Sequence, residues 1–386
     1  MSEDTYKIDG SKMLHHPDRL IKWLNAGGEL EKQLKVYPVY IEISPVGGCN
    51  HRCTFCAVDF LGYVSANVLE TSRLKDRLTE MGQKGVRSVM YAGEGEPLLH
   101  KDLAEIIAHT KNVAGIDVAI TTNATPLTDR FARIALPYTS WIKASINAGS
   151  PEKYAAIHKT KPEHFELVWK NMANAVRVRE ELGLPHDSPT LGAQMVLLPD
   201  NADTVIDFVK RAKESGLDYA VVKPYSQHKR SYTKIYEGLK YDDYMNMADE
   251  LEKLDDSNFH VVFRKSAMEN LHKSHSNNYT VCPSTPFMWA YLRANGDLYG
   301  CSAYWLDDRF IYGNINEQSF SEAWESDKRR EAIRFVAEDL DITECRENCR
   351  MARVNLDMVA LKAAKDPIAL IKQANSGKIP PHFNFI

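Results

Sequence analysis

No apolar stretch of this sequence approaches the roughly 20 residues that a membrane-spanning helix needs. The first 16 residues are polar and charged, so we expect neither a signal peptide nor a membrane anchor and interpret the chain as cytoplasmic. An excess of charge is also lacking, because 48 basic residues face 52 acidic ones and the formal net charge is −4. We therefore expect no membrane partner and no nucleic-acid partner.

Cysteine is scarce, with seven residues in a chain of 386. An odd number of thiols does not suit a chain stabilised by disulfide pairs and favours metal ligation in a reducing compartment. Hydrophobic residues make up 44% of the chain, which is enough for a sizeable core, and the length indicates two domains.

Short β-branched runs alternate with segments of helical period from Val39 onward. The pattern predicts strands at 39–44, 86–91, 116–121, 141–146, 191–197 and 219–222, with helices between them. Successive strand–helix units predict a parallel sheet with right-handed crossovers. The expected fold class is α/β, a partial (β/α)6 TIM-like barrel whose active face lies at the carboxyl ends of the strands.

Four regions are expected along the chain. Residues 1–36 form an N-terminal extension with one amphipathic segment, Arg19 to Leu34, and residues 37–235 form the barrel. Residues 236–355 form a linker and a small α+β domain, and residues 356–386 form a C-terminal helix and tail.

Three cysteines, Cys49, Cys53 and Cys56, fall within eight residues on a glycine-containing loop that follows the first strand. Thiolates so close together usually bind a metal. Zinc and ordinary ferredoxin clusters need four ligands, and no fourth cysteine lies nearby, so a [4Fe-4S] cluster here would keep one iron open. A local zinc site is the alternative.

The spacing C-x3-C-x2-C, with Phe55 just before the third cysteine, resembles the signature of radical S-adenosylmethionine (radical SAM) enzymes. The resemblance implies that SAM binds the open iron and that Phe55 lies beside the cofactor. It also implies reductive cleavage of SAM to a 5′-deoxyadenosyl radical, which abstracts hydrogen from a C–H bond. The electron would come from an external one-electron reductant of the flavodoxin or ferredoxin type.

The run Gly93-Glu94-Gly95-Glu96-Pro97 follows the second strand and resembles the family's glycine–glutamate motif, which implies that Glu96 binds the SAM amino group. A simple Gly-Pro turn is the alternative. Polar residues at or near the ends of later strands are further candidates for SAM contacts, although such residues also cap helices and satisfy backbone groups. They are Thr122, Asn123, Ser145, Asn147 and Gln194.

Four later cysteines, Cys282, Cys301, Cys345 and Cys349, flank a predicted hairpin at 287–293 and 298–302 with a turn at Gly296. Their pattern resembles the SPASM domain, or its shorter twitch form. The resemblance implies one auxiliary [4Fe-4S] cluster with four protein ligands. A four-cysteine zinc site is the alternative.

Tyr225 and His228 follow the sixth strand, on the face where substrate is expected, and Tyr304 follows Cys301. These three are the candidate catalytic acid/base residues. The expected partner is a small polar molecule such as a sugar, amino sugar, cyclitol or nucleotide sugar, which points to carbohydrate biosynthesis.

The two proposed clusters use all seven thiols, so no cysteine remains to return hydrogen to a substrate radical. This favours a dehydrogenase that oxidises a secondary alcohol with the auxiliary cluster as electron acceptor, as a resemblance to 2-deoxy-scyllo-inosamine dehydrogenase implies. A radical epimerase or rearrangement on a carbohydrate, a peptide-modifying maturase, and a zinc-stabilised non-enzymatic binding module remain open.

Overall fold

A computed structural model describes residues 10–186, 188–269, 271, 279–346 and 349–386. One ten-stranded sheet lies at its centre, in the order β10-β9-β8-β1-β2-β3-β4-β5-β6-β7. Neighbouring strands from β8 through β1 to β7 are parallel, while β8, β9 and β10 pair antiparallel. The strands are β1 (Tyr40–Ile43), β2 (Ser88–Tyr91), β3 (Asp117–Thr122), β4 (Trp141–Ser145), β5 (Thr190–Leu197), β6 (Tyr219–Pro224), β7 (His260–Phe263), β8 (Trp289–Leu292), β9 (Asp297–Tyr299) and β10 (Ile311–Asn314).

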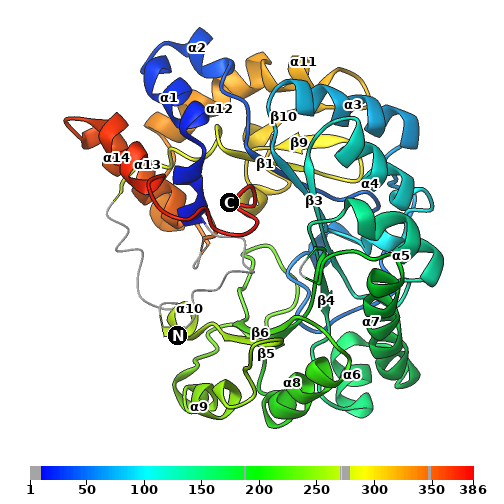
Figure 1. The fold of residues 1–386 in the computed structure, drawn as a ribbon. Helices are drawn as coiled ribbons and strands as arrows, with labels where there is room; N and C mark the ends of the chain where they lie inside the picture. The colour runs from blue at the N-terminus through cyan, green and yellow to red at the C-terminus, as the bar shows by residue number, and fades with distance from the viewer. Residues whose placement is uncertain (1–9, 187, 270, 272–278, 347–348) are drawn as a thin grey trace.

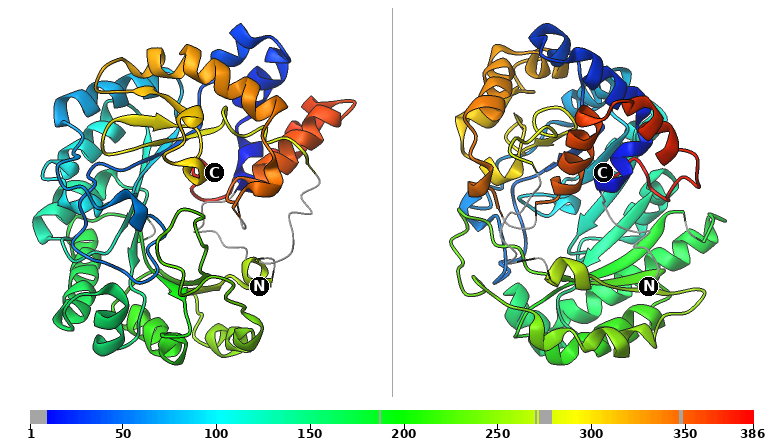
Figure 2. Two further views of the ribbon diagram at one scale, coloured as in Figure 1. Left: turned by 180° about the vertical axis from the view of Figure 1, so that it is seen from behind. Right: turned by 90° about the vertical axis from the view of Figure 1, so that its left-hand side faces the viewer.

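Helices lie along the outside of the curved sheet (Figures 1 and 2). They are α1 (Pro17–Ala26), α2 (Leu30–Leu34), α3 (Thr71–Gln83), α4 (Leu103–Asn112), α5 (Asp129–Ala135), α6 (Pro151–His158), α7 (Glu163–Glu181), α8 (Val205–Glu214), α9 (Met247–Glu252), α10 (Lys265–Glu269), α11 (Phe320–Trp324), α12 (Asp327–Glu338), α13 (Ala352–Ala363) and α14 (Pro367–Ala374). Among the described residues, no helix is both long enough and apolar enough to cross a membrane.

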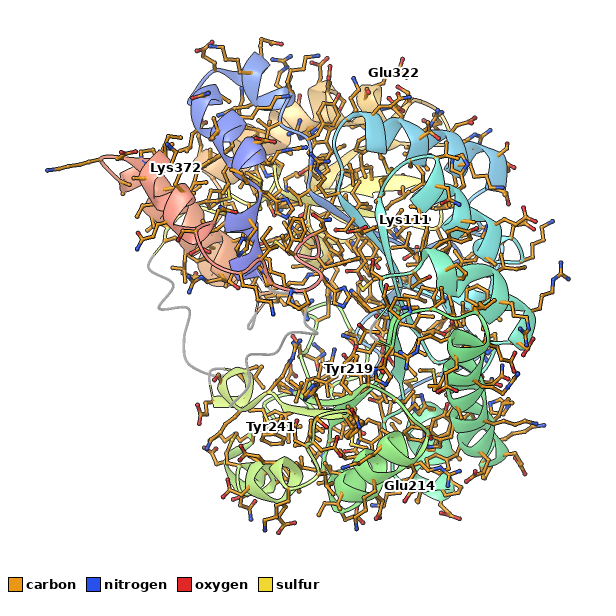
Figure 3. The ribbon with its side chains drawn as sticks, in the orientation of Figure 1. Lys111, Glu214, Tyr219, Tyr241, Glu322 and Lys372 are labelled. Carbon is orange, nitrogen blue, oxygen red and sulfur yellow. The ribbon has the colours of Figure 1, made fainter. Side chains whose placement is uncertain are left out.

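The α/β class and the mostly parallel sheet are confirmed. All six predicted strands form, because their β-branched and apolar residues fill the space between the sheet and its helices. Tyr219 lies inside the barrel, where a Cβ atom at Gly192 would come within 2.2 Å of its ring, so only glycine fits that position. The charged side chains of Glu214, Glu322 and Lys372 lie at the periphery (Figure 3).

The region expected to be a linker adds to the barrel instead. Strand β7 pairs in parallel with β6, with Tyr219 opposite His260 and Val222 opposite Phe263. Its four residues give too short an apolar run to stand out among the charged residues around them, so pairing with β6 decides its structure.

The C-terminal hairpin continues the same sheet, because β8 pairs in parallel with β1 from Tyr40 opposite Trp289 to Ile43 opposite Leu292. The predicted turn is present, with Gly296 at φ +93°, a conformation that favours glycine. The division of the chain at residue 235/236 remains a proposal.

The N-terminal extension packs against the C-terminal domain. Its predicted amphipathic segment forms two helices, α1 and α2, separated by Gly27 and Gly28. The buried guanidinium of Arg329 in α12 donates to the carbonyl oxygens of Leu34 and Val36, each at 3.1 Å. These bonds attach α2 to the domain that follows the barrel.

The last residues of the chain close the amino-terminal end of the barrel. Phe385 and Ile386 have no exposed surface, and the Phe385 ring lies 5.4 Å from that of Trp141 at the start of β4. Ser88 at the start of β2 donates to the Asn384 carbonyl, and the Asn384 amide donates to Asp117 at the start of β3 at 2.6 Å.

Candidate active site

The first three cysteines lie on the loop after β1, held against the end of α6. Backbone amides of Arg52 and Thr54 donate to the carbonyl oxygens of His158 and Ile157 at 3.1 and 2.8 Å. All three thiols are free of disulfides. Burial, together with the charge of neighbouring thiols, raises the pKa of Cys53 well above its usual value, and burial raises that of Cys49 to about 11. Three close thiols with raised pKa values ionise only when a positive charge stabilises the thiolates. A bound metal supplies that charge, so the loop fits a metal site.

His158 makes a direct contact with this cysteine set, since its Nδ1 lies 3.2 Å from the Cys53 sulfur. The other ring nitrogen, Nε2, accepts hydrogen bonds from the backbone and side-chain amides of Asn147, both at 3.3 Å. An imidazole nitrogen that accepts must leave the proton on its partner, so Nδ1 carries hydrogen and donates to the sulfur.

We expect His158→Ala to make the midpoint potential of the cluster at this loop more negative. A hydrogen bond to a ligand sulfur stabilises the extra negative charge of the reduced cluster, so losing the bond disfavours reduction. A redox titration followed by electron paramagnetic resonance measures the potential. His164→Ala is the matched control, because its Nδ1 contacts the Thr160 hydroxyl at 2.7 Å instead. An unchanged potential in His158→Ala would contradict the expectation.

The glycine–glutamate loop packs directly on the cysteine loop. The Glu96 backbone amide donates to the Gly48 carbonyl oxygen at 2.9 Å. A Cβ atom at Gly95 would lie 2.4 Å from that oxygen, so a side chain at this position would separate the two loops. Glu94, the other acid of the loop, points elsewhere and forms a buried ion pair with Arg293 at 2.8 Å.

The buried carboxylate of Glu96 accepts hydrogen bonds from the Thr122 hydroxyl and from the backbone amides of Asn123 and Leu98. A carboxylate has about four acceptor positions, so one remains, on the oxygen that Asn123 contacts. Burial outweighs these bonds and raises the pKa of Glu96 to about 7. A ligand ammonium group would restore the ionised form, which fits the amino group of SAM.

We expect Glu96→Ala to weaken SAM binding while iron content is kept. Losing one charge-assisted contact costs roughly 1.5 to 3 kcal/mol, or about tenfold to a hundredfold in the dissociation constant. Equilibrium binding of SAM to the anaerobic protein measures the change. Glu94→Ala serves as a comparison, because that carboxylate is paired with Arg293. Unchanged SAM affinity in Glu96→Ala would remove Glu96 from the site.

The other candidates for SAM contacts separate into two groups. Thr122 and Asn123 support Glu96, and the Asn123 amide also donates to Asn50 of the cysteine loop at 2.7 Å. Ser145 and Gln194 lie opposite each other on β4 and β5, and Gln194 lines the barrel cavity, so both remain candidates.

Asn147 and Phe55 have internal partners. The Asn147 amide is buried and bonded to His158, and its carbonyl oxygen accepts from the Val196 backbone amide at 2.7 Å. These bonds place Asn147 beside His158, and a contact from Asn147 to SAM stays a prediction. The Phe55 ring packs edge-on against His158, with ring centroids 5.9 Å apart.

The four later cysteines gather beside the hairpin and are also free of disulfides. Burial, followed by the charges of Cys349, Cys282 and Cys345, raises the pKa of Cys301 well above its usual value. The Asn355 amide donates to the Cys282 sulfur at 3.4 Å, and its oxygen accepts from the Ser284 amide. Four converging thiols with an oriented amide donor fit a second cluster.

The predicted acid/base residues all have bonding partners. His228 accepts from the Arg230 backbone amide at Nδ1, so Nε2 carries hydrogen and donates to the Ser302 carbonyl at 3.1 Å. Neither nitrogen is available to take a proton, and burial lowers its pKa. The Tyr225 hydroxyl donates to Gln227 at 2.8 Å. Tyr304 lies 3.5 Å from the Cys345 sulfur. Each of the three thus has an internal contact, and a part for them in acid/base chemistry stays a prediction.

A cavity of about 1400 Å³ occupies the barrel interior. Ala57 and Val58, directly after the first cysteine set, line one part of it, and Cys301 and Cys349 line another. Two cysteines of the second set therefore border this cavity, and the residues directly after the first set border it as well.

Comparison with known proteins identifies this arrangement. The Radical SAM superfamily profile matches residues 43–212, and that of the SPASM iron–sulfur cluster-binding domain matches residues 282–350. The chain carries a radical SAM domain followed by a SPASM domain. Its cofactors are therefore SAM and two iron–sulfur clusters, and it needs a reductant. A purely structural zinc module is not supported.

Curated relatives match about half of the chain. GTP 3′,8-cyclase of Chlorobaculum tepidum is 30% identical over 194 residues, 49% of this chain and 55% of the relative. GTP 3′,8-cyclase of Limosilactobacillus fermentum is 26% identical over 190 residues, 48% of this chain and 53% of the relative. The chain thus spans about half the length of the curated relatives that it matches.

Solved structures share the fold of most of the chain. Streptococcus suis SuiB bound to S-adenosylmethionine has a TM-score of 0.61 and 19% identity, covering 86% of this chain and 76% of SuiB. Native anSMEcpe with bound AdoMet has a TM-score of 0.56 and 17% identity, covering 87% of this chain and 95% of that protein. These similarities show that the radical SAM and SPASM fold extends over most of the chain.

Sequence reasoning missed two features of the site. It predicted no helix at α6, so His158 was not recognised. It also gave no role to Arg346 and Arg350, which line the cavity and each follow a SPASM cysteine. The repeated Cys-Arg pair was a signal that could have been noticed.

Proposed function

We propose that this radical SAM enzyme oxidises a secondary alcohol on a small polar substrate held inside the barrel. The observation that carries the proposal is the cavity that Cys301 and Cys349 line directly and that Ala57 and Val58, next to Cys56, line as well. A substrate there would lie between the site of radical formation and an electron acceptor.

Cys49, Cys53 and Cys56 would hold the SAM-cleaving [4Fe-4S] cluster, with Glu96 on the SAM amino group. Cys282, Cys301, Cys345 and Cys349 would hold an auxiliary [4Fe-4S] cluster. When bound, these groups supply a 5′-deoxyadenosyl radical and an acceptor for one electron. The overall change converts SAM and the alcohol to 5′-deoxyadenosine, methionine, a ketone and a proton.

The protein's own residues define where this chemistry takes place. Tyr291 and Trp305 wall the cavity, with ring centroids 4.4 Å apart, and their apolar surface excludes water. His228, on the loop after β6, donates a hydrogen bond to the backbone carbonyl of Ser302, the residue after Cys301. This bond would keep the loop that faces the substrate in contact with the auxiliary-cluster site.

Epimerisation is less well supported, because the proposed clusters use all seven thiols and leave none to donate hydrogen. Ring closure on a nucleotide is a second candidate. The relatives named GTP 3′,8-cyclase favour it through their similarity to about half of this chain. Peptide modification has a precedent in SuiB, which was solved with a precursor peptide, but that similarity concerns fold.

Product analysis tests the proposal. The reduced anaerobic enzyme is incubated with SAM and candidate sugars, cyclitols or nucleotides in deuterated water, and reactions without SAM are the control. A ketone two mass units lighter than its substrate is the expected result. A product of unchanged constitution that carries one deuterium from the solvent would contradict oxidation and establish epimerisation. A cyclised isomer of a nucleotide would establish the second candidate.

A further inference from the structure

Positive charge is concentrated in the barrel cavity. Lys223 at the end of β6 lines it, as do Arg346 and Arg350 from the segment before α13. Lys143 on β4 and Arg264 after β7 line it as well. These five residues come from four separate parts of the chain, so the fold brings them together around one space.

The cations are close enough to affect one another. Burial lowers the pKa of Lys223 well below its usual value, and the next causes are the charges of four cations. No carboxylate is among its main influences. The ammonium of Lys223 therefore lies where positive charge accumulates without a matching negative group.

The acidic residues of the cavity do not neutralise this cluster. Glu42 on β1 is bonded to Arg350, with the carboxylate oxygen 2.7 Å from the guanidinium nitrogen. Asp249 and Glu252 also line the cavity, but both are exposed and belong to its solvent side. Asp255, a further acid of the lining, accepts from the Val261 backbone amide at 2.8 Å and lies 3.5 Å from the His260 ring nitrogen.

Two of the cations have unused donors. Arg346 donates from Nη2 to the Ser226 hydroxyl at 2.7 Å, while its buried Nε has no hydrogen-bond partner among the described residues. Within that part of the chain, Lys223 has neither a hydrogen-bond acceptor nor an ion-pair partner. Buried charged donors without acceptors are costly, and a bound anion relieves the cost.

We propose that Lys223 and Arg346, with Arg350 beside them, bind a phosphate or diphosphate group of the substrate. The proposal rests on the proposed function for the location of the substrate and adds its chemical class. A guanidinium fork and an ammonium suit phosphate oxygens. Several cations gathered around one space suit an anion of two or more charges better than an anion of a single charge. The Ser226 hydroxyl lines the same space and can also donate.

Inorganic pyrophosphate is the probe, and its binding to the reconstituted anaerobic holoenzyme is measured by calorimetry at constant ionic strength. Lys223→Met and Arg346→Met are each expected to weaken binding at least tenfold. Lys170→Met and Arg334→Met remove exposed cations of the same types and are expected to leave the affinity within twofold of wild type. Equal affinity in all variants, or no binding to wild type, would overturn the proposal.

Two further measurements keep the result specific. Arg346 is next to Cys345 in the sequence, so the iron content is measured in every variant. Lys223 is remote in sequence from any cysteine, so Lys223→Met must show weaker pyrophosphate binding while its iron content stays that of wild type. SAM affinity is expected to stay within twofold of wild type in Lys223→Met. A tenfold loss of SAM affinity would show that the cations hold the SAM carboxylate, against the proposal.

Malonate distinguishes the two anion chemistries. Weaker binding of malonate than of pyrophosphate supports a phosphate site, whereas tighter binding overturns the assignment. None of these measurements involves turnover. If pyrophosphate does not bind as expected, alcohol oxidation is still tested separately by product analysis. If no ketone forms, the binding measurements still test the anion site.

Discussion

The Cys53→Ala variant is expected to form no 5′-deoxyadenosine when the anaerobic protein is reduced with dithionite in the presence of SAM. Cys53 is the central thiol of its set and receives the hydrogen bond from His158. Without one of three protein ligands the cluster is lost or misplaced, and reductive cleavage of SAM stops. Chromatography of 5′-deoxyadenosine and methionine measures the effect, which should match that of Cys49→Ala and Cys56→Ala.

A Cys282→Ala variant is the control for that experiment, because its thiol belongs to the other set. It should still cleave SAM. Continued cleavage in a variant lacking all three N-terminal thiols would refute the assignment of the site.

The second large effect is expected at the auxiliary site. Cys301→Ala should contain about half the iron of wild type and should unfold at a lower temperature, because metal binding contributes to the folding of such domains. Cys301 borders the cavity and directly follows the segment that contains β9, so its loss removes both a ligand and an anchor of the hairpin. SAM cleavage should persist while product formation ceases.

Iron analysis, thermal denaturation and product assays measure these three effects separately. Ser302→Ala, one residue further along, changes a neighbouring side chain without removing a thiol and is the matched control. Full iron content together with full product formation in Cys301→Ala would show that this thiol does not take part.

The sequence was most informative where function depends on local spacing. The cysteine triplet, the glycine–glutamate loop and the hairpin around Gly296 each lie within a short segment, and the structure brings the predicted neighbours together. The six barrel strands were predictable for a similar reason, since a strand buried on both faces has a continuous apolar run. Strand β7 lacked such a run and takes its structure from β6.

Contacts between distant segments could not be predicted in this way. His228 is a reasonable candidate base from its usual pKa, but its Nε2 donates a hydrogen bond to the carbonyl oxygen of Ser302, 74 residues away. Asn147 lies just after β4, where a residue that binds the cofactor is expected. Its side-chain amide donates to Nε2 of His158 and so fixes the proton of that ring on Nδ1. Lys223 and Arg346 lie more than 100 residues apart in the sequence, and only the curved sheet places them near each other.

The closure of the barrel floor by the last residues has a consequence for biosynthesis. Strands β1 to β4 have their amino-terminal ends covered by Phe385 and by the contacts of Asn384, which are made near the end of the chain. These strands are synthesised well before Asn384 and Phe385, so their amino-terminal ends stay uncovered until those two residues have left the ribosome. A barrel that lacks these two residues would keep the Trp141 and Tyr40 rings exposed at its floor.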